Sequence, residues 1–241
     1  KADPPDLVDV QARKRALATF AANAPQRLVR LRAALRDGSY RPRALRRVAI
    51  PKDDGGERVL AIPAVVDRIA QTAIAQALTP WLEREFEDSS FGYRPGRSVQ
   101  DAVRRVSELR AAGLTHVVDA DISAFFDSVP HESLLARLAE SMDEGPTTQL
   151  IALWLEHAGN DGRGLAQGSP LSPLLSNLCL DRIDEAFAGR GARIVRFADD
   201  FVILCRSHDA AGESWHVREA DECRTVLYCI RLRELRNLTY W

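Results

Sequence analysis

The sequence predicts an α+β fold, and three observations support this prediction. Two short apolar runs flank a DDGG turn in residues 46–63, which is a strong β-hairpin signal. Two further apolar, β-branched runs surround adjacent aspartates in "RIVRFADDFVILC", residues 193–205. Between these hairpins lie helical patterns and one more strand pattern. The order hairpin, helices, strand, helices, hairpin indicates α+β layering.

The first elements are two short amphipathic helices within residues 10–36. The helical spacing of their apolar residues is broken at Pro25 and stopped by Gly38. The hairpin of residues 46–63 comes next, and Lys52 and Arg58 flank its tip.

A longer helix is expected over residues 64–87, with a kink at Pro80. The loop "DSSFGYRPGRS" follows, and Ser98 is expected to cap a helix over residues 99–113.

The second half of the chain reads as a strand over residues 115–122, helices over 132–142 and 146–158, and a glycine-rich loop. The loop turns into a helix at Ser172 and Pro173, the order expected of an N-cap followed by proline in the first turn.

The composition is that of an ordinary folded protein, with 46% hydrophobic and 28% charged residues among 241. No apolar run approaches the roughly 20 residues needed to cross a bilayer, and the first residues do not resemble a signal peptide. We therefore expect a cytoplasmic protein with no membrane partner. Because the chain begins with Lys1 and not Met, we expect a fragment or a processed form.

The four cysteines include no CxxC pair and lie in or near apolar runs, so we expect buried, reduced thiols. A zinc site formed by His216, Cys223 and Cys229 is the alternative.

Charge is unevenly distributed, although the net formal charge is only −1. Residues 1–58 carry 14 Lys and Arg against 7 Asp and Glu. A basic front section is what phosphate binding requires, because affinity for nucleic acid comes largely from counterion release. Solvated helix faces explain the same charge, so it does not decide the function alone.

Carboxylates follow both apolar strand patterns. Asp119, Asp121 and Asp127 lie in "HVVDADISAFFDSVP", and Asp199 and Asp200 form the turn of the second hairpin. Aspartate is also a good turn former, so the hairpin pair alone has a simple structural explanation. If the two strands are neighbours, however, these carboxylates meet, and such a cluster is tolerable chiefly when a cation neutralises it. Mg²⁺ is the expected ion.

Five segments of the sequence resemble motifs of reverse transcriptases, specifically those of the bacterial group II intron type. "DADISAFFDSVPHESLL", "GLAQGSPLSPLLSNLCLDRID" and "RFADDFVILC" resemble the palm motifs, and "IPKDDGGERVLAIPAVVDRIAQTAIAQAL" and "SSFGYRPGRSVQDAV" resemble the fingers. The resemblance runs from about Tyr40 to Ser207. It implies a polymerase right hand, with N-terminal helices and fingers in residues 1–115 and a palm in residues 116–207. The palm is an antiparallel sheet packed on helices.

No thumb is recognisable in the sequence after the palm. Residues 208–241 read as an atypical tail, and the lysine expected near the palm of such an enzyme has no match there. We therefore expect little processive synthesis by this chain alone.

The resemblance implies an RNA-directed DNA polymerase that adds dNTPs to the 3′-hydroxyl of a DNA or RNA primer on an RNA template. Asp121, Asp199 and Asp200 would be the catalytic carboxylates. Asp121, Asp199 and the backbone carbonyl of Ile122 would bind two Mg²⁺ ions, for which Mn²⁺ can substitute, and Asp200 would tune the site.

Further residues complete the implied nucleotide site. Lys52 and Arg58 match finger residues that grip the triphosphate, although two solvated cations on a surface hairpin are the alternative. Phe126 would lie under the sugar and exclude a 2′-hydroxyl, unless it only packs beside Phe125. Gln167 and Gly168 resemble the segment that lies against the incoming nucleotide and the template base.

Arg94 and Arg97 resemble positions near the template backbone, and a loop charged for solubility is the alternative. His131 is expected to begin a helix and not to act in catalysis.

The biological role implied is group II intron mobility, with intron RNA as a partner. Two alternatives remain open at the level of sequence. One is a non-catalytic, maturase-like module that binds RNA through the basic front section. The other is a CRISPR-associated or host-defence reverse transcriptase.

Overall fold

The computed structural model describes residues 7–51, 55–122, 124–159, 161–188, 191–215 and 230–237. Lys52 and the candidate zinc ligands His216, Cys223 and Cys229 lie outside these described residues. Cys179 and Cys205 are buried, as expected.

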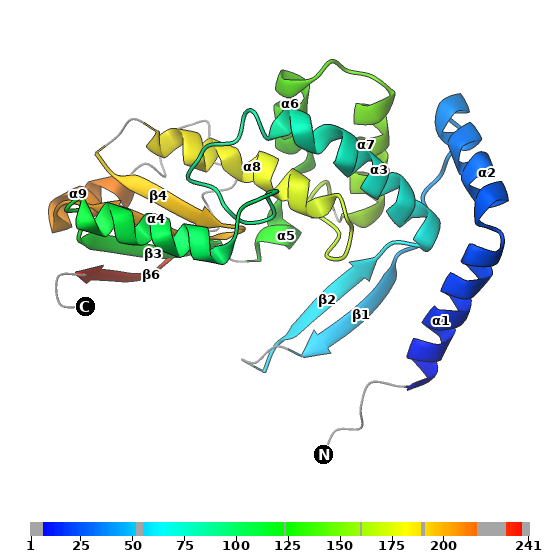
Figure 1. Cartoon of the computed structure of the whole chain (residues 1–241), viewed down its shortest axis with the longest axis horizontal. Helices are drawn as coiled ribbons and strands as arrows, with labels where there is room; N and C mark the ends of the chain where they lie inside the picture. Colours follow the sequence, from blue (N-terminus) through cyan, green and yellow to red (C-terminus); the bar gives the residue numbers. More distant parts are fainter. Residues whose placement is uncertain are drawn as a thin grey trace.

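Two helices and a hairpin form the N-terminal part of the structure (Figure 1). Helices α1 (Leu7–Ala22) and α2 (Ala24–Asp37) meet at Asn23, and Gly38 ends α2 in the left-handed conformation with φ 74°. Strands β1 (Arg46–Pro51) and β2 (Glu57–Ile62) pair antiparallel. The predicted helix pair and hairpin are confirmed.

The next two helices begin close to where the sequence predicts. Helix α3 (Val65–Leu82) includes Pro80 in its last turn and ends five residues before the expected residue 87. Helix α4 (Val99–Ala111) begins with a capping box. The Ser98 hydroxyl accepts from the Asp101 backbone N–H at 3.3 Å, and the Asp101 carboxylate accepts from the Ser98 backbone N–H at 2.9 Å.

Four antiparallel strands form the main sheet, in the order β4, β5, β3, β6. Their bounds are β3 (His116–Ile122), β4 (Arg193–Phe197), β5 (Asp200–Cys205) and β6 (Ile230–Asn237). The predicted pairing of the strand at 115–122 with the hairpin at 193–205 is confirmed. Strand β6 was not predicted, and it pairs with the edge of β3 opposite to β5.

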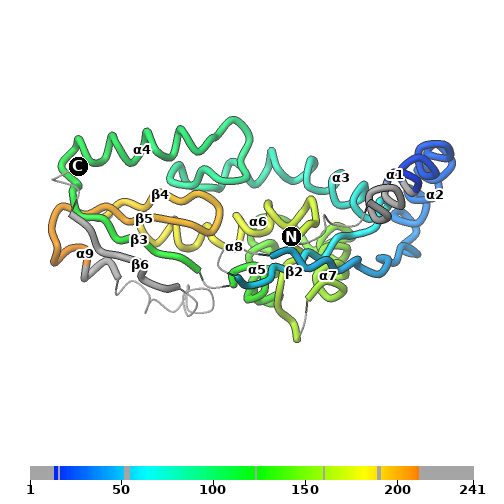
Figure 2. The backbone as a smooth tube through the Cα atoms, turned by 90° about the horizontal axis from the view of Figure 1, so that it is seen from below, coloured from blue at the N-terminus to red at the C-terminus, as the bar shows by residue number. Residues whose placement is uncertain are grey.

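Helices cover both faces of this sheet. Along β3, Val117 joins a cluster with Leu109 of α4, whereas Val118 joins the main core around the central helix α8 (Ser172–Phe187). The alternation follows from the period of two in a strand, which sends successive side chains to opposite faces. Figure 2 shows α4 running along one side of the sheet.

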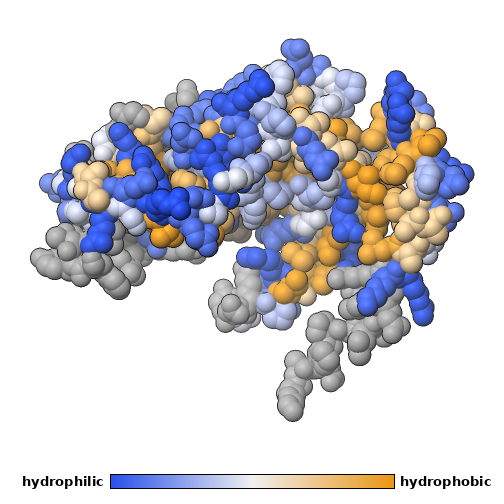
Figure 3. Space-filling view, viewed as in Figure 1, coloured by the Kyte–Doolittle hydropathy of each residue, from blue (hydrophilic) through white to orange (hydrophobic). Residues whose placement is uncertain are grey.

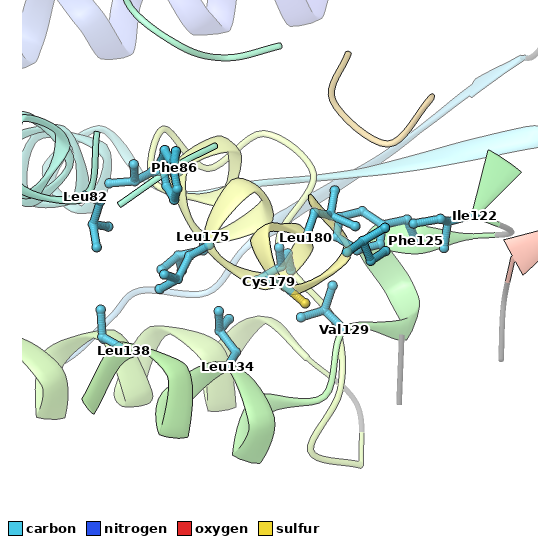
Figure 4. Close-up of a cluster of buried hydrophobic side chains, with 14 of the residues drawn as sticks. Leu82, Phe86, Ile122, Phe125, Val129, Leu134, Leu138, Leu175, Cys179 and Leu180 are labelled. Carbon is cyan, nitrogen blue, oxygen red and sulfur yellow. The ribbon is translucent and has the colours of Figure 1, made fainter. Parts of the chain in front are cut away.

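The main core surrounds α8, which is buried along most of its length. Figure 4 shows Leu175, Cys179 and Leu180 of this helix among apolar side chains from neighbouring elements. These elements include α5 (Phe125–Ser128), α6 (His131–Ser141) and α7 (Pro146–Ala158), and α9 (His208–Trp215) packs against β5 and β3. As expected, His131 begins a helix, and its ring bonds the Gly164 carbonyl.

Ser172 is not the N-cap that the sequence predicts. It is the first residue of α8, Leu171 precedes it as the cap residue, and the Ser172 hydroxyl donates to the Ala166 carbonyl at 2.9 Å. The hydroxyl therefore ties the preceding glycine-rich loop to the helix, because that buried carbonyl needs a partner.

The exposed surface differs between the two ends of the molecule. Apolar surface gathers over the hairpin and the N-terminal helices, whereas the α4 end is largely hydrophilic (Figure 3). Leu17, Leu28, Val29, Ile50 and Val59 are exposed in that N-terminal part. None of the helices in the described ranges is both long and apolar enough to span a bilayer.

Candidate active site

The structure brings the predicted carboxylates together at one end of the main sheet. Asp121, near the end of β3, is the register partner of Asp200, the first residue of β5. Asp199 lies in the two-residue turn that joins β4 to β5, since Phe197 pairs with Asp200 across it. Residues far apart in the sequence thus converge because two antiparallel strands are in register.

These carboxylates line a cleft with a volume of about 850 Å³. Its other walls come from β2, the start of α3, the loop containing Tyr93, helix α5 and the loop before α8. The residues that line it are Glu57, Arg58, Val59, Leu60, Arg68, Tyr93, Asp121, Ile122, Ala124, Phe125, Phe126, Asp127, Gln167, Gly168, Ser169, Pro170, Ser172, Pro173, Asp199 and Asp200.

The electrostatics of the cleft favour a bound cation. Burial raises the pKa of the Asp199 carboxyl, the negative charges of Asp200 and Asp121 raise it further, and the Arg58 guanidinium opposes this shift. Burial raises the pKa of the Tyr93 hydroxyl, the negative charges of Asp199 and Asp200 raise it further, and the Arg58 guanidinium opposes this shift. A positive ion at the carboxylates would relieve this repulsion.

The donor set fits a hard cation that takes only part of its ligands from the protein. Among the residues that the structure describes, no group of three or more His, Cys, Asp and Glu side chains forms a complete metal site. Mg²⁺ commonly uses one or two carboxylates and completes its octahedron with water and substrate phosphates. Asp121 and Asp199 offer such carboxylates, and Ile122 lies beside Asp121 in the same cleft.

The turn that carries Asp199 is held in a left-handed conformation. Ala198 has φ 58°, which is uncommon for a residue with a side chain. The backbone of Gly92 lies directly against it, because a Cβ added at Gly92 would be 2.1 Å from the Ala198 nitrogen. Only glycine permits this approach.

Phe126 lies at the cleft and also at the edge of the core. It is half-buried and packs edge-on against the buried Phe125, with ring centroids 5.7 Å apart. The position therefore accommodates both interpretations of this side chain, a wall of the nucleotide site and core packing.

The segment of Gln167 and Gly168 is docked on the hairpin. The Ala61 N–H of β2 donates to the Gln167 carbonyl at 2.8 Å. Gly168 has φ 121°, and a Cβ there would lie 3.4 Å from the Ile62 side chain. This contact joins the hairpin to the loop before α8, and both elements contribute residues to the lining of the cleft.

Two cations on the hairpin side line the cleft. Arg58 is exposed, and the sequence predicts it as a residue of the nucleotide site. Arg68, on α3, also lines the cleft, but the sequence does not predict it as a site residue. The Nε of Arg68 is buried and has no hydrogen-bond partner within the described part of the chain, which is unusual for a buried polar atom. The "VVDRIAQ" segment gave no sign of this, because one arginine in a helix reads as a solvated charge.

The structure does not place Arg94 where a template could reach it. Its side chain is 2% exposed, forms an ion pair with Glu83 at 3.0 Å, and donates to the Glu87 and Ser90 carbonyls. Arg97 is 24% exposed and pairs with Asp88 at 2.7 Å. Neither residue lines the cleft among the residues named above. The hydrogen bonds and ion pairs of both arginines stabilise the loop that carries Tyr93.

Tyr93 is a cleft residue that the sequence reasoning missed. It is 51% exposed and has φ 59°, a conformation that a bulky residue adopts only when its surroundings impose it. The segment "FGYRPGRS" contains it, but the charge of its arginines is a clearer sequence signal than one aromatic side chain.

A cleft walled by a hairpin and floored by strand-end carboxylates is the arrangement of a polymerase fingers and palm. Residues 50–230 match the family model described as "Reverse transcriptase (RNA-dependent DNA polymerase)", and the chain belongs to this family. It has the α+β fold of that family, with an antiparallel palm sheet packed on helices.

Known relatives agree with this assignment. The chain is 32% identical to Protein YkfC of Escherichia coli over 82% of this chain and 62% of that protein. It is 32% identical to the group II intron-encoded protein LtrA of Lactococcus lactis over 63% of this chain and 26% of that protein. The chain thus spans less than two thirds of either relative's length.

A solved structure supports the fold alone. The telomerase of Candida albicans superposes with a TM-score of 0.63 at 13% identity, covering 83% of this chain and 42% of that chain.

Proposed function

We propose that this chain catalyses RNA-directed DNA synthesis, adding dNTPs to a primer 3′-hydroxyl on an RNA template with two Mg²⁺ ions. The observation that carries the proposal is the convergence of Asp121, Asp199 and Asp200 on one cleft by strand register. When bound, the ions would activate the 3′-hydroxyl and stabilise the transferring α-phosphoryl group.

The residues of this chain have distinct roles in the proposal. Asp121, Asp199 and the Ile122 carbonyl would hold the ions, and Asp200 would tune their charge. Arg58 would bind the triphosphate across the cleft, where positive donors match phosphate oxygens, and Lys52, six residues earlier in the sequence, would add a second cation. Their place on a hairpin would let them close over the nucleotide.

Two further contacts would select the substrate. Phe126 would lie under the deoxyribose, and the exposed Gly168 would let the nucleotide approach the backbone. Arg94 is not included among the template contacts, because its donors are occupied within the protein.

The test is addition of a single dNTP to a primer annealed to an RNA template, with Mg²⁺ binding measured by calorimetry in parallel. Asp199→Ala is expected to abolish both. The matched control is Asp209→Asn, since that carboxylate is 98% exposed and absent from the cleft lining. Equal Mg²⁺ binding by the wild type and Asp199→Ala would count against the two-metal site.

We further propose that the RNA partner is a group II intron. The similarity to LtrA supports this role, and the basic front section supplies cations for RNA binding. Intron RNA should compete better than an unrelated structured RNA of equal length at 0.15 M salt. Equal competition would instead favour a CRISPR-associated or defence role. RNA binding without nucleotide addition would favour the maturase-like module.

A further inference from the structure

We propose that Arg196 and Asn177 form an internal clamp that positions Asp199 for metal binding. They are positioning residues, because neither lines the cleft and both are fully buried. The inference rests on the proposed two-metal function and adds to it the residues that set the geometry of the metal-binding turn.

Arg196 forms a hydrogen bond to the Asp199 turn from the buried side of the turn. It lies on β4, is 0% exposed, and its Nη1 donates to the Ala198 carbonyl at 2.8 Å. Ala198 directly precedes Asp199, so this bond fixes the peptide unit from which the metal-binding residue extends. The same Nη1 donates to the Asn177 Oδ1 at 2.9 Å.

Asp184 holds the guanidinium in place. This carboxylate on α8 is also 0% exposed and accepts from Nε at 3.0 Å and from Nη2 at 2.5 Å. Such a two-point bond fixes the plane of the guanidinium, and therefore the direction in which Nη1 points. The central helix α8 is thus the rigid support of the clamp.

Asn177 connects this support to the opposite side of the turn. Its Nδ2 donates to the Gly92 carbonyl at 2.9 Å, and the Gly92 backbone packs against Ala198. The turn is therefore held on one side by the Arg196 bond and on the other by the Gly92 contact. One asparagine links the two.

Two features indicate that the turn needs such support. Ala198 is in the left-handed region, which is strained for a residue with a Cβ. The carboxylates of Asp121 and Asp200 repel Asp199. Before a cation binds, both effects favour opening of the turn, and the clamp opposes them.

Burial of an ion pair in a core also carries a large desolvation free energy. Its desolvation cost is often greater than its Coulombic gain, so an apolar pair would be at least as stable. The proposed role in positioning Asp199 gives a reason for the Arg196 guanidinium to be buried under the turn.

A second ion pair on α8 provides a matched control. Asp181 is 0% exposed and accepts from Arg137 of α6 at 2.8 Å. The pair joins α6 to α8, and Arg137 has no contact with the Ala198 turn among the interactions of the described residues. Breaking it should cost stability without moving Asp199.

The experiment compares Asn177→Ala and Arg137→Lys with the wild-type chain. Mn²⁺ affinity is measured by the electron paramagnetic resonance signal of the free ion, alongside KM for dNTP and the thermal unfolding midpoint. Asn177→Ala should weaken Mn²⁺ binding by about tenfold, as loss of residues that orient metal ligands does elsewhere, and change KM less than twofold. Arg137→Lys should lower the unfolding midpoint and leave Mn²⁺ affinity unchanged.

A milder variant guards against loss of folding. Asn177→Asp keeps an oxygen for Arg196, but it replaces the donor to Gly92 by a negatively charged acceptor that repels the Gly92 carbonyl, so it should weaken Mn²⁺ binding in the same direction. If both Asn177 variants bind Mn²⁺ as the wild type does, the clamp is structural only and the inference is overturned. Wild-type Mn²⁺ binding that survives Asp199→Ala is a different result, since it refutes the two-metal function itself.

Discussion

Substitution of Gly92 by alanine should displace the turn that carries Asp199, although Gly92 itself does not line the cleft. The added Cβ would lie 2.1 Å from the Ala198 nitrogen, where ordinary contact begins at 3.4 Å. The backbone segments of Gly92 and Ala198 must therefore separate by about 1.3 Å, the difference between these distances. Gly92 does not have a positive φ, so alanine itself adopts its conformation without strain and the effect is steric.

A displacement of about 1 Å at a reacting group costs roughly 100-fold in rate. We therefore expect the single-turnover rate of dNTP addition by Gly92→Ala to fall about 100-fold, with little change in primer–template affinity. The rate is measured by rapid quench at saturating Mg²⁺, and the unfolding midpoint is recorded to verify folding.

Gly191→Ala is the matched control, because a Cβ there meets nothing within 4 Å. It lies just before β4 and should react at the wild-type rate. A folded Gly92→Ala protein that adds dNTP within threefold of the wild-type rate would refute the reasoning, since the turn would then tolerate the displacement.

Three further predictions concern individual side chains. Arg68→Gln should weaken binding of dNTP or primer–template about tenfold, because its buried Nε lacks a protein partner; unchanged KM and anisotropy titrations would contradict this. Ser98→Ala should lower the urea-unfolding free energy by about 1 kcal/mol through loss of the α4 cap, and an effect below 0.3 kcal/mol, roughly, would be too small for a cap. Burial raises the pKa of Asp181 from 3.8 to about 6. Its contribution to stability is therefore greatest below pH 3.8 and is lost as the pH rises to about 6, a dependence that Asp181→Asn should flatten in urea titrations across this range.

The sequence was sufficient to predict the elements whose local signals are unambiguous. The hairpin strands on either side of DDGG, the Ser98 cap and the apolar runs around Asp199 have local signals, and each lies where expected. The meeting of Asp121 with the Asp199 turn was also predicted, because strand-end carboxylates need a shared neutralising partner.

Strand β6 escaped prediction because a β-bulge interrupts its alternation. Ala120 pairs with Leu232 and Asp119 with Glu234, so Arg233 is an extra residue between them. Apolar residues at 230, 232 and 235 therefore do not follow a period of two. The bulge that accommodates this irregular spacing is defined only by the pairing of β6 with β3.

The role of Arg94 could not be read from sequence for a different reason. An arginine that binds a phosphate and one that binds buried carbonyls have the same local pattern "GYRPGRS". Glu83, which decides between them, lies eleven residues away in sequence at the end of α3. Arg68 and Tyr93 were missed because their significance depends on which walls surround the cleft.

The place of β6 has a practical meaning for shortened versions of the chain. The strand occupies one side of β3 from His116 to Ile122, so removal of residues 230–237 would leave seven backbone positions, including that of Asp121, open to pairing with a strand of another molecule. Unprotected sheet edges recruit other chains and promote aggregation. Versions trimmed to the palm motifs should therefore precipitate at concentrations that the longer chain tolerates.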